Sequence, residues 1–73
     1  MNSRTEMERY MRLALEEATL AFHAGEVPVG AVLVRNGEVV SRAHNRVETL
    51  HDATAHAELL CLRDAMAKLG ARL

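Results

Sequence analysis

A chain of 73 residues can form at most one small domain, near the size at which a single apolar core is only just sufficient for stability. Apolar residues make up 49% of it and charged residues 26%, which excludes a disordered composition, and its net charge of -1 gives no overall basic field for nucleic acid, although a local basic patch stays open. The single cysteine excludes an internal disulfide framework, and we find neither a signal peptide nor an apolar run of roughly 20 residues, so we expect a soluble cytoplasmic protein.

The first predicted element is a helix that ends at Gly25, because glycine tolerates the left-handed conformation of a helix end. Ser3 with Glu6 fits a capping box, in which each side chain satisfies the other's backbone N–H. Thr5 with Glu8 fits one equally well, so the start stays open between the two. Apolar residues then recur at helical spacing, at Met7, Met11, Ala14, Ala18 and Ala21.

The next element is predicted to be an antiparallel hairpin. Residues 29–34 form a short run rich in valine, which is typical of a buried strand. Asn36 and Gly37 follow, and this pair favours a tight hairpin turn because both residues accept positive φ. The second strand should then run to about His44.

Residues 45–52 are polar and irregular, and we expect a loop there. Asp52 or Thr54 can cap a second long helix, which should run to Leu69 and stop at Gly70. Apolar residues lie on most sides of this helix, at Leu59, Leu60, Cys61, Leu62, Ala65, Met66 and Leu69. Such a helix is normally buried, and one hairpin with one other helix cannot cover it, so we expect a partner or further chain to pack against it.

His56 and Glu58 lie two residues apart where the second helix starts. In mid-helix, side chains two apart point about 200° away from each other, but in the first turn both lean towards the N-terminus. A neutral imidazole there can bind zinc, and a carboxylate can move protons to and from a water that the metal activates. The spacing alone does not separate this pair from a histidine and a surface glutamate of the capping region, which is the commoner arrangement. Cys61, deep in the apolar helix, is predicted to be a core residue.

The stretch VPVGAVLV, the NG turn, the strand ending at His44 and Asn45, and the stretch TAHAE resemble the cytidine deaminase-like zinc deaminases, most of all the bacterial tRNA-specific adenosine deaminases. The resemblance runs from about Met11 to Leu69. It implies an α/β fold, in which this chain is the α-β-β-α N-terminal part of a three-layer cytidine deaminase-like architecture with an incomplete sheet.

The resemblance also implies roles for individual residues. His56 would be the first zinc ligand, and Glu58 the catalytic proton shuttle between the water and the leaving amino group. The Ala57 N–H would help to hold the base, Asn45 would hydrogen-bond the sugar or base, and Val29 would line the base pocket. The implied reaction is zinc-dependent hydrolytic deamination of adenosine to inosine at the wobble position of a tRNA anticodon loop, by a homodimeric enzyme.

The P-C-x-x-C half of the family's zinc site is missing from the sequence, and Cys61 stands in the wrong place to replace it. We therefore expect residues 1–73 to be a partial CMP/dCMP-type deaminase domain, truncated before that half and inactive by itself. Two alternatives stay open. One is a fragment of a free-nucleoside, nucleotide or guanine deaminase, and the other is a non-catalytic fragment that folds only with a partner.

Overall fold

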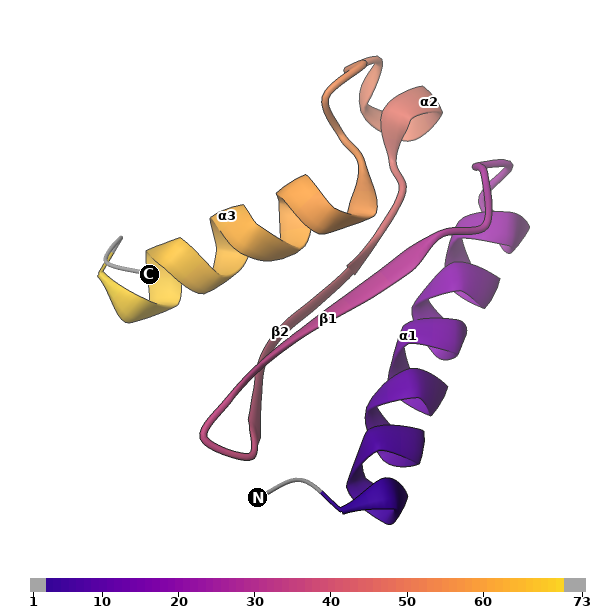
Figure 1. The fold of residues 1–73 in the computed structure, drawn as a ribbon. Helices are drawn as coiled ribbons and strands as arrows, with labels where there is room; N and C mark the ends of the chain where they lie inside the picture. Colours follow the sequence, from indigo (N-terminus) through magenta and orange to yellow (C-terminus); the bar gives the residue numbers. More distant parts are fainter. Residues whose placement is uncertain (1–2, 71–73) are drawn as a thin grey trace.

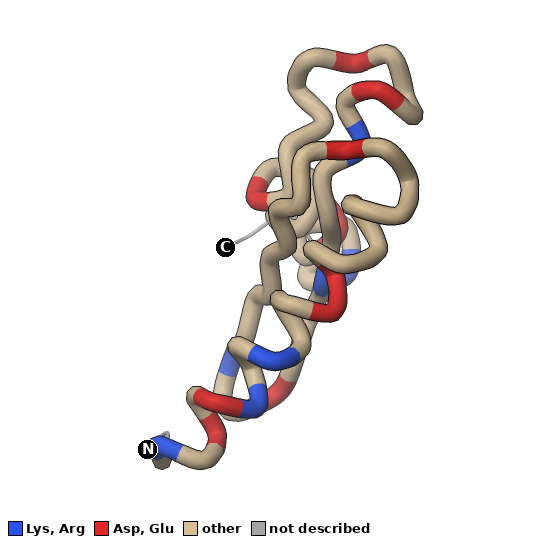
Figure 2. The backbone as a smooth tube through the Cα atoms, turned by 90° about the vertical axis from the view of Figure 1, so that its right-hand side faces the viewer, with Lys and Arg blue, Asp and Glu red and all other residues tan. Residues whose placement is uncertain are grey.

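The computed structural model describes residues 3–70, in which a two-stranded hairpin lies between two long helices (Figure 1). The elements in chain order are α1 (Arg4–His23), β1 (Gly30–Arg35), β2 (Glu38–His44), α2 (Val47–Leu50) and α3 (Ala57–Leu69). Helix α1 packs on one face of the hairpin and α3 on the other. Acidic and basic residues are interspersed along the molecule, without a large basic block in the view of Figure 2.

Helix α1 begins as one of the two predicted capping boxes requires. The Glu6 N–H donates to Ser3 Oγ at 3.1 Å, and the Ser3 N–H reaches Glu6 Oε1 at 3.4 Å. Glu8, the partner in the other box, instead pairs with Arg4 one helical turn away. Gly25 follows the helix end with a φ of 77°, as predicted.

The hairpin and its turn are confirmed. Strands β1 and β2 pair antiparallel from Gly30 opposite His44 to Arg35 opposite Glu38, with an irregularity between Leu33 and Val34. Asn36 and Gly37 adopt φ values of 52° and 78°, which are the left-handed values that a tight hairpin turn needs. Residue 29 lies just before β1 and not inside it.

Two local predictions after the hairpin are wrong. Residues 45–52 do not form a plain loop, because the one-turn helix α2 lies there; its Glu48 N–H donates to the carboxylate of Glu26, from another part of the chain. Helix α3 begins at neither predicted cap, since its N-cap is His56. The Asp52 carboxylate instead accepts hydrogen bonds from the backbone N–H and the hydroxyl of Thr54, which closes a local turn ahead of the helix.

The core consists mostly of small side chains. Its apolar members are Tyr10, Ala21, Ala55, Ala57, Cys61 and Ala65. Within residues 3–70 no large side chain is fully buried, and on α3 Leu59 and Leu62 are 40% and 41% exposed. The apolar surface of α3 is therefore only partly covered, as the sequence indicated: the hairpin packs against it, whereas α1 lies on the opposite face of the hairpin. No helix within residues 3–70 is long and apolar enough to cross a membrane.

Candidate active site

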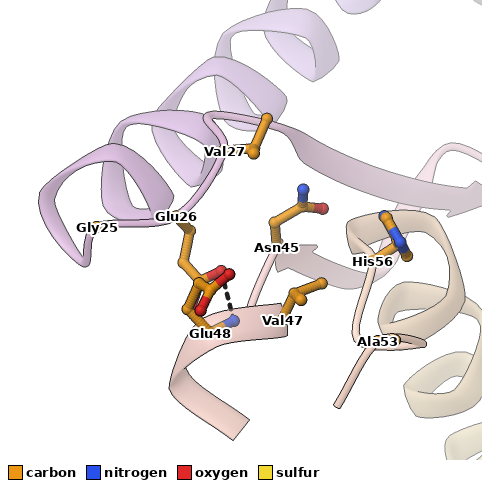
Figure 3. A pocket seen from close by; sticks show the side chains of 8 residues that line it. All are labelled: Gly25, Glu26, Val27, Asn45, Val47, Glu48, Ala53 and His56. Carbon is orange, nitrogen blue, oxygen red and sulfur yellow. Dashed lines mark hydrogen bonds between the residues drawn. The ribbon is translucent and has the colours of Figure 1, made fainter. Parts of the chain in front are cut away.

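A cavity of about 380 Å³ opens where four segments meet: the α1–β1 connection, the end of β2, α2 and the residues just before α3 (Figure 3). Its lining residues are Gly25, Glu26, Val27, Asn45, Val47, Glu48, Ala53 and His56. A volume in the range of roughly 300–1,000 Å³ suits a small organic ligand such as a nucleobase. Of the five site residues predicted from the sequence, Asn45 and His56 line this cavity.

Asn45 joins the end of β2 to the start of α3. Its side chain is buried, and Asn45 Oδ1 accepts a hydrogen bond of 2.7 Å from the backbone N–H of Ala57. Its own backbone N–H donates to Val29 O at 3.1 Å, which continues the hairpin ladder by one residue. The side chain of His56, the N-cap residue, makes no capping hydrogen bond. Asn45, twelve residues before Ala57 in the chain, caps the helix in its place.

The imidazole of His56 lies at the cavity, across from Asn45 (Figure 3). His56 has an extended backbone, with φ and ψ of -80° and 148°, and its carbonyl accepts the first helical hydrogen bond of α3, from Leu60. Its place at the helix start agrees with the argument made from its spacing to Glu58. Glu58 itself lies in the first turn of α3, is exposed, and is not one of the lining residues.

The other two predicted residues lie as follows. The Ala57 N–H, which was predicted to hold the base, donates to Asn45 here, so a base at this position would have to replace or share that hydrogen bond. Val29 is not a lining residue, whereas Val27, two residues earlier, is one. The roles of these residues stay predictions.

Glu26 is the main site feature that the sequence did not reveal. It is buried, and its carboxylate accepts hydrogen bonds from the N–H groups of Glu48 and Thr49 and from the Thr49 hydroxyl. The Thr49 hydroxyl, together with these backbone donors, holds the pKa of Glu26 below its ordinary value although burial opposes this. Glu26 thereby fixes α2 against the α1–β1 connection and forms one wall of the cavity.

No group of three His, Cys, Asp or Glu side chains in residues 3–70 is placed to hold a metal ion. Cys61 is buried, with its Sγ 3.0 Å from Ser41 Oγ, and is a core residue as predicted. Of the predicted site residues that line the cavity, His56 is the one with a side chain that can bind zinc, and its role as a ligand stays a prediction.

Comparisons with known proteins agree with this geometry. Residues 4–73 match the family described as the cytidine and deoxycytidylate deaminase zinc-binding region. The chain is 51% identical over 65 residues to the tRNA-specific adenosine deaminase of Aquifex aeolicus, an alignment that covers 89% of this chain and 43% of that protein. It is 66% identical over 58 residues to a stretch of the tRNA(Ile)-lysidine synthase of Thermus thermophilus, with 80% of this chain and 11% of that protein covered.

Solved structures share the fold. One from a study of A-to-I editing by tRNA:A34 deaminases at the wobble position of transfer RNA superposes with a TM-score of 0.87 at 49% identity, covering 90% of this chain and 49% of that chain. The guanine deaminase from Bacillus subtilis superposes with a TM-score of 0.83 at 38% identity, covering 97% of this chain and 43% of that chain. The chain thus spans less than half the length of each of these proteins. The predicted fold class and resemblance are confirmed, and the chain belongs to the cytidine and deoxycytidylate deaminase zinc-binding family.

Proposed function

We propose that this chain supplies the base-binding and proton-shuttling part of a zinc-dependent deaminase that hydrolyses adenosine to inosine and ammonia at the wobble position of a tRNA. The observation that carries the proposal is the meeting of Asn45 and His56 at one cavity, with Glu58 in the adjoining helical turn. The similarity to the Aquifex aeolicus enzyme supports a tRNA substrate. We infer that residues 1–73 are part of a deaminase domain whose P-C-x-x-C half lies outside them.

The residues would divide the work by position. Asn45, fixed between β2 and α3, would orient the nucleoside in the cavity. His56 is the residue of this chain that would hold zinc, and the metal when bound would activate the attacking water. The Glu58 carboxylate would accept a proton from that water and deliver it to the leaving amino group. A homodimer and a cytoplasmic location, both implied by the resemblance, are predictions that go with this function.

A chimera tests the proposal. The segment of the Aquifex aeolicus enzyme that matches this chain is replaced by the chain itself, so that the remaining elements of the fold are present. The chimera should form inosine in an anticodon stem-loop with adenosine at the wobble position. Glu58→Ala should keep zinc and lower kcat by about 10²–10⁴-fold, because the proton shuttle is lost while the ligand remains. His56→Ala should lose both zinc and activity.

Glu38→Ala is the matched control, since Glu38 is exposed at the start of β2 and is not a lining residue of the cavity. Inosine formation by Glu58→Ala at the rate of this control would contradict the role of Glu58. A second candidate function is deamination of guanine, which the similarity to the Bacillus subtilis guanine deaminase supports. Turnover of free guanine without turnover of the stem-loop would favour it.

A further inference from the structure

One buried carboxylate lies outside the cavity and has no part in the reaction proposed above. Glu17, on α1, is 7% exposed, and both of its oxygens are engaged by β2. Arg42 Nε donates to Glu17 Oε2 at 2.7 Å, and His44 Nδ1 lies 2.9 Å from Glu17 Oε1. Burial raises the pKa of Glu17, but the hydrogen bonds from His44 and Arg42 outweigh it and hold the pKa below its ordinary value. An ionised carboxylate only accepts hydrogen bonds, so His44 Nδ1 carries the proton in this contact.

Strand β2 presents alternate residues to the two helices, as its period of two requires. Arg42 and His44 contact Glu17 on α1, whereas Ser41 Oγ donates to the Cys61 carbonyl on α3. Asn45 comes directly after His44 and again contacts α3, through the Ala57 N–H. His44, the last residue of β2, is therefore held by α1, and the next residue, Asn45, is held from the opposite side by α3.

Glu17 reaches β2 because α1 lies very close to β1 at Gly30, the residue paired with His44. A Cβ atom at Gly30 would lie 2.1 Å from the carbonyl oxygen of Ala14 and 2.6 Å from the backbone nitrogen of Ala18. The absence of a side chain at Gly30 lets the helix approach, so that Glu17 spans β1 and meets its partners on the next strand. Glu17 thus contacts the last residue of β2, His44, and Asn45 follows directly after it.

We propose that Glu17 is a positioning residue for substrate binding: by holding His44 it fixes the end of β2 and so the direction in which Asn45 meets the nucleoside. This inference rests on the proposed function, and deepens it by adding a residue that touches no substrate. A merely structural role would lower the amount of folded enzyme and hence the apparent kcat, leaving KM unchanged. A positioning role raises KM, because Asn45 is presented wrongly in enzyme that is folded.

The test compares Glu17→Gln with Glu16→Gln in the chimera. The neighbouring Glu16 is exposed and also bonds Arg42, at 3.2 Å, but does not touch His44. Glu17→Gln should raise KM for the stem-loop about tenfold, with kcat changed by less than about threefold. A tenfold change corresponds to the free energy of about one hydrogen bond to a charged group. Glu16→Gln should leave both constants unchanged. A fall in kcat with no change in KM would overturn the proposal.

A second readout needs no substrate. The Ala57 amide, whose hydrogen bond goes to Asn45, should exchange its hydrogen about tenfold faster in Glu17→Gln, while amides in the β1–β2 ladder keep their rates. Equal acceleration of all these amides, or none at Ala57, would overturn the positioning role. If the chimera forms no inosine, the proposed function fails, but amide exchange still decides whether Glu17 positions Asn45.

Discussion

The isolated 73-residue chain exposes more surface than a folded monomer of its mass should. Its accessible surface is 5179 Å², whereas the scaling of area with mass gives about 4,500 Å² for 8.1 kDa. With roughly 57% of protein surface apolar, the excess includes about 400 Å² of apolar area, worth about 10 kcal/mol at 25 cal/mol per Å². Because whole domains are stable by only about 5–15 kcal/mol, we predict that the isolated chain lacks fixed tertiary packing or self-associates.

The exposed apolar surface is concentrated on α1 and beside the hairpin. Met11, Leu15 and Phe22 are 61%, 61% and 64% exposed, and they lie along one side of α1 at spacings of four and seven residues. A second, apolar cavity of about 330 Å³ lies where this side of α1 meets β1. Within residues 3–70, β1 pairs only with β2, so its other edge is open to a further strand.

A proton–nitrogen NMR spectrum together with sedimentation at low micromolar concentration measures both properties. We expect helical content with few dispersed signals, or sedimentation as an oligomer. The double variant Met11→Gln with Leu15→Gln should reduce self-association without restoring dispersion, whereas Arg12→Gln, elsewhere on the helix surface, should change neither. A dispersed spectrum from a monomer with a cooperative melt would refute the reasoning and show that this α-β-β-α unit folds by itself.

Three further predictions concern the zinc site and the α1–hairpin contact. Equilibrium dialysis of the 73-residue chain should find only weak zinc binding, because His56 is the one ligand predicted in it. One tightly held zinc per chain would mean that another side chain joins the site. In the chimera, Gly30→Ala should lower Tm by about 6–12 °C, since the new Cβ would lie 2.1 Å from Ala14 O and overpacking costs up to about 3 kcal/mol. Gly37→Ala is the control for backbone strain, because Gly37 has a positive φ but open space around a Cβ atom. If Gly30→Ala lowered Tm no more than Gly37→Ala, the close approach of α1 to β1 at Gly30 would be contradicted. The pKa of Glu17 in the folded chain is lowered from its ordinary value of 4.5, so ionised Glu17 stabilises the fold above that pH. The free energy of unfolding should therefore fall as the pH drops below about 4.5 and through the lower, folded pKa. Urea titrations at pH about 6 and about 3.5 measure this loss, and Glu17→Gln should make the difference in the free energy of unfolding between the two pH values smaller. An unchanged difference would contradict the assignment of this pH dependence to Glu17.

Much of the secondary structure could be predicted because it depends on contacts within a few residues. The capping box joins Ser3 to Glu6, and the hairpin turn needs only that Asn36 and Gly37 accept positive φ. The missing cover over α3 could also be predicted, because it follows from the number of apolar positions around one helix. The resemblance placed Asn45 and His56 at the site, and both line the cavity.

What the sequence could not provide are the hydrogen bonds that join distant segments. Helix α2 forms where a loop was predicted because Glu26, 22 residues before Glu48, accepts its N–H groups. Helix α3 starts later than predicted because Asn45, and no local side chain, caps Ala57. The sequence by itself determined the two long helices and the hairpin, since local hydrogen bonds and spacing decide these, and its motifs indicated the family by resemblance. Only the tertiary structure decided the cavity wall at Glu26 and the contact of Glu17 with His44, because both require segments more than twenty residues apart to pack together.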